Sequence, residues 1–268
     1  MIRDITIGQY YPAESVIHRL DPRVKLVGTL TFIISLFLHR SFLMYLVAAV
    51  FLTIVIKASK VPFRFMIKGL KAIMVLLLIT VLFNMFLTPG TPLIRIWKLT
   101  LTVEGVKQAA FMAIRLAFLI VGSSVMTLTT TPNHLTDGME KGLAPLNKLH
   151  VPVHEVSMIM SIALRFIPIL LEETDKIMKA QEARGADFDS GNLIQKAKSL
   201  VPLLVPLFIS AFRRANDLAM AMEARGYRGG EGRTKMKPLI YQKRDRMAYG
   251  VLLGYLAVMI LVGQFAPF

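Results

Sequence analysis

The fold class is decided by residues 42–87, which read FLMYLVAAVFLTIVI, then KASKVPFRFMIKGLK, then AIMVLLLITVLFNMFL. The two outer runs, 42–56 and 72–87, contain no charged residue, whereas 57–71 carries five Lys or Arg and no acid. A bilayer core of about 30 Å requires about 20 mostly apolar residues in a helix, and flanking Lys and Arg side chains can reach the interface. The pattern predicts two membrane-spanning helices joined by a basic segment.

Similar apolar runs recur along the 268-residue chain, which is 54% hydrophobic and only 18% charged. A soluble domain usually carries about a quarter charged residues. We therefore expect an all-α, polytopic membrane protein with about five transmembrane helices. Arg115 lies inside the fourth run and must face protein, water or a polar partner. The expected spans are residues 24–38, 42–56, 72–88, 109–128 and 247–265.

The distribution of positive charge predicts the orientation. Lys and Arg are enriched in cytoplasmic loops, which places 57–71, the N-terminus and residues 129–246 inside and the C-terminus outside. The net charge of +15 is then explained by a membrane topology, and we expect no nucleic-acid partner. The first long apolar run begins only after Lys25, so the first segment is expected to be a retained span rather than a signal peptide.

Residues 129–246 differ from the rest because they are amphipathic. Their two apolar runs, VSMIMSIALRFIPILL and LVPLLVPLFISAF, are interrupted by proline, and each is expected to begin a long helix near the membrane that continues beyond it. The expected domains are a membrane part at 1–128, a cytoplasmic region at 129–246 and a final span at 247–268. The second helix carries apolar residues at spacings of three and four, which we call the predicted stripe. Its members are Leu204, Leu207, Ala211, Ala215, Leu218 and Met222.

A short charged element occurs twice, as AQEARGADF at 180–188 and AMEARGYRG at 221–229. Glycine terminates helices readily, and an arginine in the last turn interacts favourably with the helix dipole by roughly 0.3–1 kcal/mol, so simple helix punctuation is one interpretation. The match extends beyond the cap, however, which favours two similar acceptors on partner proteins. The matched residues include Glu182, Ala183, Arg184 and Gly185 in the first copy and Glu223, Ala224, Arg225 and Gly226 in the second.

The paired Ala-Arg-Gly elements in this architecture resemble the transmembrane T component (EcfT) family of energy-coupling factor (ECF) transporters. Asp21 and Pro22 also resemble the start of that family's first span. The resemblance implies a non-catalytic subunit in a prokaryotic cell membrane, which joins two cytoplasmic ATP-binding cassette ATPases to a separate substrate-binding membrane protein for uptake of a vitamin or metal ion. It further implies that Arg184 and Arg225 each engage one ATPase through two long coupling helices, and that the predicted stripe contacts the substrate-binding protein.

Two other functions stay open at this point. A permease of an ordinary ATP-binding cassette importer also presents a cytoplasmic coupling element, but usually one per chain. A membrane-embedded enzyme acting on lipid-linked substrates would need acids or histidines at the span ends; neither Glu172, Glu173 and Asp175 nor the pair His150 and His154 forms a convincing set. The chain contains no cysteine, and we expect no catalytic residue, metal or cofactor.

Overall fold

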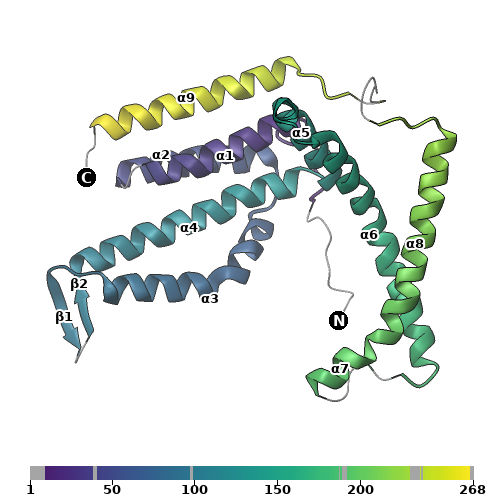
Figure 1. The fold of residues 1–268 in the computed structure, drawn as a ribbon. Coiled ribbons are helices and arrows are strands. Elements are labelled where there is room, and N and C mark those ends of the chain that lie inside the picture. The colour runs from purple at the N-terminus through teal and green to yellow at the C-terminus, as the bar shows by residue number, and fades with distance from the viewer. Residues whose placement is uncertain are drawn as a thin grey trace. The chain divides into compact units, whose positions relative to one another are not determined.

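The computed structural model describes residues 10–38, 41–96, 99–186, 188, 192–229, 236 and 238–265. The architecture is almost entirely helical (Figure 1), which confirms the predicted fold class. The chain divides into two compact units: residues 8–141 with 239–268, which we call the bundle unit, and residues 142–238, which we call the hairpin unit. The elements of the bundle unit are α1 (Pro22–Leu38), α2 (Phe42–Ser59), α3 (Phe63–Leu87), β1 (Pro92–Ile96), β2 (Leu99–Thr102), α4 (Val103–Thr129), α5 (Pro132–Leu143) and α9 (Lys243–Phe265).

Within the described residues, four helices are long and apolar enough to cross a membrane, namely α2, α4, α9 and α6 (Val153–Glu182). The two halves of α3 are bent by 61° and provide a fifth span if they cross together. The predicted number of about five agrees with this range, but the membership differs, because α6, which we expected in the cytoplasmic region, is also long and apolar enough to cross. The first expected span corresponds to α1, which has 17 residues and measures about 26 Å at 1.5 Å per residue.

The segment at 89–108, for which we expected a loop or an interfacial segment, contains regular structure. Strands β1 and β2 pair antiparallel, with Arg95 opposite Thr100 and Ile96 opposite Leu99. Helix α4 then begins at Val103, six residues earlier than the expected fourth span. Thr102 caps it, because its hydroxyl oxygen accepts a hydrogen bond from the Gly105 N–H at 3.1 Å.

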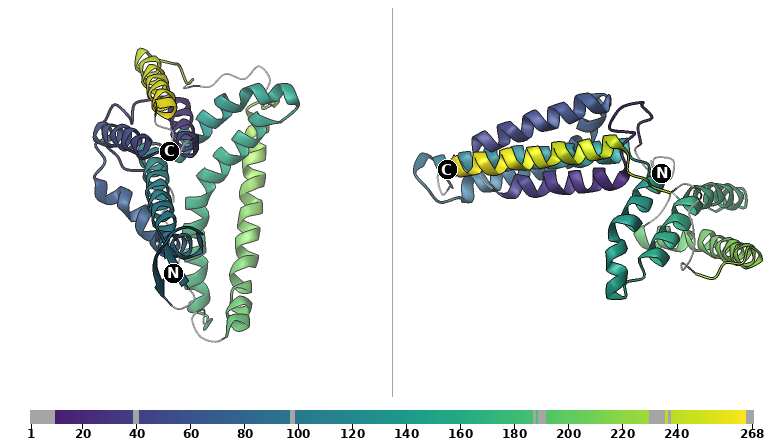
Figure 2. Two further views of the ribbon diagram at one scale, coloured as in Figure 1. Left: turned by 90° about the vertical axis from the view of Figure 1, so that its left-hand side faces the viewer. Right: turned by 90° about the horizontal axis from the view of Figure 1, so that it is seen from above.

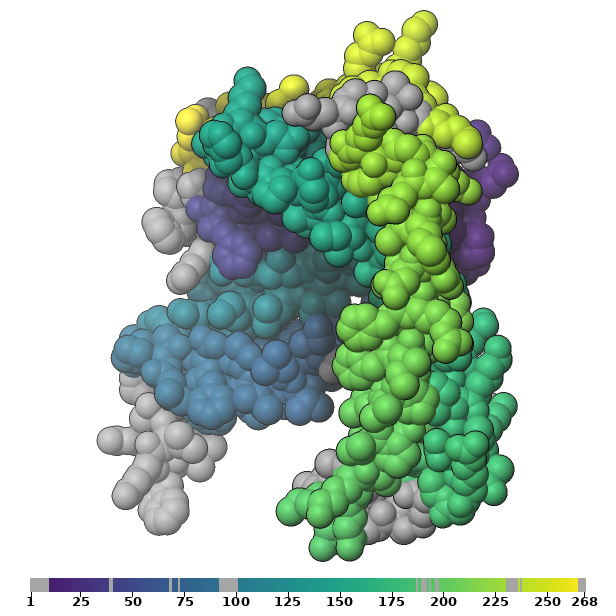
Figure 3. Space-filling model, turned by 45° about the vertical axis from the view of Figure 1, so that its right-hand side comes forward, coloured from purple at the N-terminus to yellow at the C-terminus, as the bar shows by residue number. Residues whose placement is uncertain are grey.

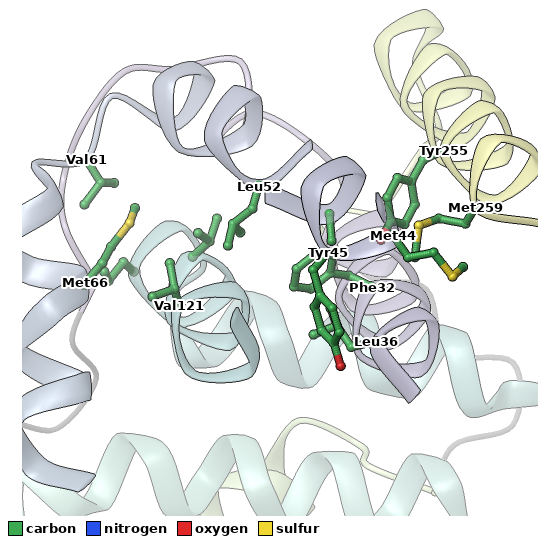
Figure 4. Packing of buried hydrophobic residues seen from close by; sticks show 13 residues of the cluster. Phe32, Leu36, Met44, Tyr45, Leu52, Val61, Met66, Val121, Tyr255 and Met259 are labelled. Carbon is green, nitrogen blue, oxygen red and sulfur yellow. The ribbon is translucent and has the colours of Figure 1, made fainter. Parts of the chain in front are cut away.

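The apolar core of the bundle unit lies between α1, α2, α4 and α9 and reaches α3 at Met66 (Figure 4). Phe51 and Tyr255 stack with their ring centroids 4.2 Å apart, and the Tyr255 hydroxyl lies 2.7 Å from Ser35 Oγ. These contacts attach α9 to α1 and α2, although α9 follows them by about 200 residues, and Figure 2 shows the three helices side by side. The core residues are Phe32, Leu36, Met44, Tyr45, Ala48, Leu52, Val61, Met66, Val121, Val125, Leu128, Tyr255 and Met259.

Arg115, the charged residue in the fourth apolar run, faces protein as expected. Its Nε donates a hydrogen bond to the Tyr45 hydroxyl at 3.0 Å, and its guanidinium lies 5.1 Å from the centre of the Phe37 ring. Both partners come from other helices of the bundle unit. The Arg115 guanidinium therefore interacts with a hydroxyl and with an aromatic ring. Such polar and cation–π contacts lower the cost of placing a charged side chain among apolar helices.

The start of α1 and the start of α9 share a buried polar cluster. Asp21 Oδ1 and Oδ2 accept hydrogen bonds from Arg23 Nε and Nη2 at 3.0 and 2.8 Å. The buried Asp245 carboxylate accepts from the Asp21 N–H at 2.9 Å and from the Gln242 N–H at 2.8 Å. Burial acts to raise the pKa of Asp21, but the hydrogen bonds from Arg23 outweigh it and hold the pKa below its ordinary value. The Asp245 side chain thus joins the starts of two helices that are remote in sequence.

Candidate functional site

The first Ala-Arg-Gly element ends α6, the long helix of the hairpin unit. Gly185 has φ 88°, and its N–H donates a hydrogen bond to the Glu182 carbonyl at 2.9 Å. The Ala186 N–H donates to the Gln181 carbonyl at 3.0 Å. These two bonds with a left-handed residue define a Schellman cap, and the positive φ explains the glycine.

The second element ends α8 (Val201–Ala224) in the same way. Gly226 has φ 67°, and its N–H donates to the Glu223 carbonyl at 2.9 Å. The Tyr227 N–H donates to the Met222 carbonyl at 3.0 Å. The repeated sequence therefore has a repeated backbone structure, and the same side chains project from equivalent positions of both caps.

The arginines of these two caps are exposed to solvent. Among the described residues, neither the Arg184 nor the Arg225 guanidinium has a hydrogen-bond or ion-pair partner. An ideal Cβ built on either cap glycine meets no atom within 4 Å, so the surface beside each arginine is open. The remaining predicted coupling residues are also exposed: Glu182, Ala183, Gly185, Glu223, Ala224 and Gly226.

Helices α6 and α8 pack antiparallel, and an ion pair connects them at a point equally far in sequence from both caps. Arg214 Nη2 lies 2.8 Å from Glu173 Oε2, with side-chain exposures of 36% and 28%. Arg184 follows Glu173 by eleven residues, and Arg225 follows Arg214 by eleven. The ion pair thus joins equivalent positions of the repeat and lies at the centre of a local pseudo-two-fold arrangement. At 1.5 Å per residue the two arginines are roughly 33 Å apart along the helix pair.

The cap at the end of α8 also borders a concave surface of about 520 Å³ between α6 and α8. Arg165 of α6 lines this surface together with Arg225 and Arg228, so three cations face one concavity. Leu218 and Met222 form its apolar part. Arg165 and Arg228 were not among the predicted site residues. Arg228 follows Arg225 by three residues and was visible in the second element, whereas only the antiparallel packing of the two helices brings Arg165 there.

The predicted stripe on α8 divides between two surfaces. Leu207, Ala211, Leu218 and Met222 are half-buried, and the last two contribute to the concavity beside α6, whereas Leu204 and Ala215 are exposed. Most of the large exposed apolar side chains of α8 lie instead on a face that we did not predict, which we call the open face. Figure 3 shows α8 in the foreground as a continuous ridge beside α6. The open face consists of Val201, Val205, Phe208, Ile209 and Phe212, each more than half exposed.

In the part of the chain that the structure describes, we find no cluster of side chains suited to catalysis or metal binding. No group of three or more His, Cys, Asp or Glu side chains could hold a metal ion there. Glu173, one of the acids considered for catalysis, is paired with Arg214. His150 adopts φ 59° and caps the short helix η2 (Ala144–Leu149), which is a structural position.

The fold defines a polytopic helical membrane protein in which α6 and α8 end in the same arginine-bearing cap. Comparison with known proteins identifies its family. A family described as cobalt transport protein (CbiQ) matches residues 13–236. A Clostridium kluyveri protein named energy-coupling factor transporter transmembrane protein EcfT is 59% identical over 264 residues, covering 97% of each chain. Proteins of that name from Thermosediminibacter oceani and Bacillus subtilis are 53% identical over 264 residues (98% of this chain, 99% of the relative) and 49% over 246 (91% and 93%).

The chain therefore belongs to the EcfT family, the transmembrane components of energy-coupling factor transporters. The resemblance noted in the sequence is confirmed at the level of the family. Membership favours a transporter subunit over the ordinary importer permease and over the membrane-embedded enzyme.

Proposed function

We propose that this chain transmits ATP-driven motion from two cytoplasmic ATPase subunits to a separate substrate-binding membrane protein. The observation that carries the proposal is the pair of identical Schellman caps, each presenting an exposed arginine with no described intramolecular partner. Helix punctuation alone requires neither the matched flanking residues nor two free guanidinium groups. Their planar forks suit grooves lined by carboxylates or carbonyls, where several hydrogen bonds form at once.

The separation of the two arginines supports engagement of two subunits rather than one. A distance of roughly 33 Å along the helix pair is too large for a single groove but fits two neighbouring globular partners. The local pseudo-two-fold arrangement around Glu173 and Arg214 matches a pair of related ATPases. The concavity beside Arg225, with Arg165 and Arg228, favours an acidic contact on one of the two partners.

The substrate-binding protein is proposed to pack on α8. The open face offers a membrane-buried partner a row of exposed apolar side chains, including Phe208 and Phe212. The exposed members of the predicted stripe, Leu204 and Ala215, extend that surface. The transported substrate is proposed to be a vitamin or a metal ion. The proposed topology has residues 57–71 and 129–246 in the cytoplasm and the C-terminus outside; both chain ends lie outside the described residues.

The test is copurification of the ATPases with tagged chains at equal membrane abundance. The variants are Arg184→Ala, Arg225→Ala and the double change, and the matched control is Arg213→Ala, an exposed arginine on α8 away from both caps. Truncating one member of a buried charge-assisted contact costs about 2–5 kcal/mol. The other arginine-bearing cap can still hold the complex together, because binding at one cap raises the effective concentration of the ATPases at the other.

We expect each single variant to reduce uptake coupled to ATP hydrolysis while part of the complex survives. The double variant should lose the ATPases, and Arg213→Ala should behave as wild type. Full ATPase recovery and full uptake in the double variant would reduce the two caps to helix punctuation and remove the main support for the proposal.

A further inference from the structure

An apolar groove of about 410 Å³ lies within the bundle unit, between α1, α2, α4 and α9. This volume falls in the range of small-molecule sites, roughly 300–1,000 Å³. Small residues leave the space open, among them Gly28 of α1, Ala58 of α2 and Ala248 of α9. Representative apolar walls are Val24, Phe32, Ile54, Val55, Met247 and Val251.

The groove is charged at one end only. Lys25 and Arg244 line it near the starts of α1 and α9, whereas Phe32 and Leu252 line it seven and eight residues further along the same helices. At 1.5 Å per residue, the apolar part extends about 10–12 Å from the charged end. A ligand that fits must therefore be amphipathic, with a polar head and an apolar tail of that order of length.

Arg244 is the group that such a head would meet. Its Nε is shielded from solvent and has no hydrogen-bond partner among the described residues. A buried donor of this kind is costly, and native proteins normally supply an acceptor. The other cation of the groove is already engaged, because Lys25 Nζ donates to the Thr129 carbonyl at 2.8 Å and to the His18 carbonyl at 3.1 Å.

The carboxylates at the starts of α9 and α1 are also engaged elsewhere. Both oxygens of Asp245 accept backbone hydrogen bonds, and Asp21 binds Arg23 through both of its oxygens. The Arg244 guanidinium therefore faces the groove with an unmet donor and little local compensation. Arginine binds phosphate oxygens well because its planar fork matches their geometry.

We propose that this groove binds a glycerophospholipid of the surrounding bilayer, with its phosphate on Arg244 and one acyl chain along α1 and α9. The lipid would bridge α9, the last helix, to the first two spans and to α4. This proposal requires only that the chain is a membrane protein of this fold. It is therefore independent of the proposed coupling to the ATPases.

The test measures lipid binding to the full-length chain in mild detergent by native mass spectrometry, with phosphatidylglycerol as the probe and the diacylglycerol of the same acyl chains as the headless comparator. Arg244→Gln removes the charge, and its matched control is Arg246→Gln, an exposed arginine of the same helical turn that does not line the groove. Ala248→Phe fills the groove, and its control is Ala257→Phe, which places the same ring on an exposed position of α9 outside it.

We expect Arg244→Gln to weaken phosphatidylglycerol binding roughly 10-fold to 100-fold, the factor associated with one charge-assisted hydrogen bond, while Arg246→Gln changes it little. Ala248→Phe should displace the lipid and Ala257→Phe should not. Diacylglycerol should bind the wild type no better than phosphatidylglycerol binds Arg244→Gln, and millimolar inorganic phosphate should not release bound lipid. Equal binding of the two lipids, equal effects of the two arginine changes, or retention in Ala248→Phe would each overturn the proposal.

Discussion

Replacement of Asp245 by alanine should detach the start of α9 from the start of α1. The Asp245 side chain is buried, with 1% relative exposure for the residue, and it accepts one hydrogen bond from the backbone of Asp21 and one from the backbone of Gln242. The first bond connects positions 224 residues apart in sequence. Alanine removes both acceptors and leaves the two N–H groups without partners.

The two lost hydrogen bonds differ in their effect on stability. A bond to a charged group contributes about 1.5–3 kcal/mol. Gln242 is exposed, so its N–H can bind water instead, whereas Asp21 is buried and its N–H cannot. We therefore expect a net loss of about 2–4 kcal/mol, which raises the population of the opened helix start roughly 30-fold to 1,000-fold. The Tyr255–Ser35 contact and the Phe51 stack lie further along α9, so the opening should stay local.

Hydrogen–deuterium exchange of the detergent-solubilised chain measures this opening directly. Peptides covering residues 239–250 should exchange at least about tenfold faster in Asp245→Ala, while peptides from α6 keep their wild-type rates. The control is Glu14→Ala, which removes an exposed ion pair with Arg19, where both side chains are more than half exposed. Exchange in 239–250 that is the same in Asp245→Ala and Glu14→Ala would refute the reasoning.

Three further outcomes are expected. In a chain without native cysteine, a membrane-impermeant thiol label should reach Thr91→Cys but not His150→Cys in intact cells; labelling of the latter would reverse the proposed orientation. Phe212→Arg should release the substrate-binding protein without unfolding the chain, because Phe212 is 68% exposed, and wild-type copurification of this variant would exclude the open face as an interface. Leu218→Glu should instead disturb the packing of α6 on α8, and an unchanged size-exclusion profile would contradict that role of Leu218. Tyr45→Phe removes the acceptor of the α4 guanidinium and should lower the free energy of unfolding by about 1–3 kcal/mol; an unchanged thermal midpoint would show that this hydrogen bond is dispensable.

The membrane-spanning character, the helical class and the two capped helix ends could all be predicted from local sequence. Long apolar runs need no tertiary information, since the bilayer thickness alone sets their length. The Glu-Ala-Arg-Gly repeat likewise specifies its own caps, because the left-handed glycine and the two backbone hydrogen bonds involve only six consecutive residues. These features were visible before any packing was considered.

Which side of α8 packs on α6 and which side stays exposed could not be predicted from local sequence. Its first half, VPLLVPLFISAF, is apolar on every side, so periodicity cannot decide which residues pack on α6 and which remain open. The predicted stripe included Leu218 and Met222, which border α6, and omitted Phe208 and Phe212, which are exposed. The contribution of Arg165 to the second cap depends on the same packing.

The sequence by itself determined that this chain is a helical membrane protein and that two arginine-bearing helix ends repeat, because these properties depend on composition and on short-range backbone chemistry. The EcfT family was indicated by the resemblance of those repeated elements. Only the tertiary structure decided that Asp245 meets Asp21, that Glu173 meets Arg214 and that Arg244 faces an apolar groove. Each of these contacts joins residues that are remote in sequence or on different helices. Their geometry follows from how helices pack, which no local pattern of residues specifies.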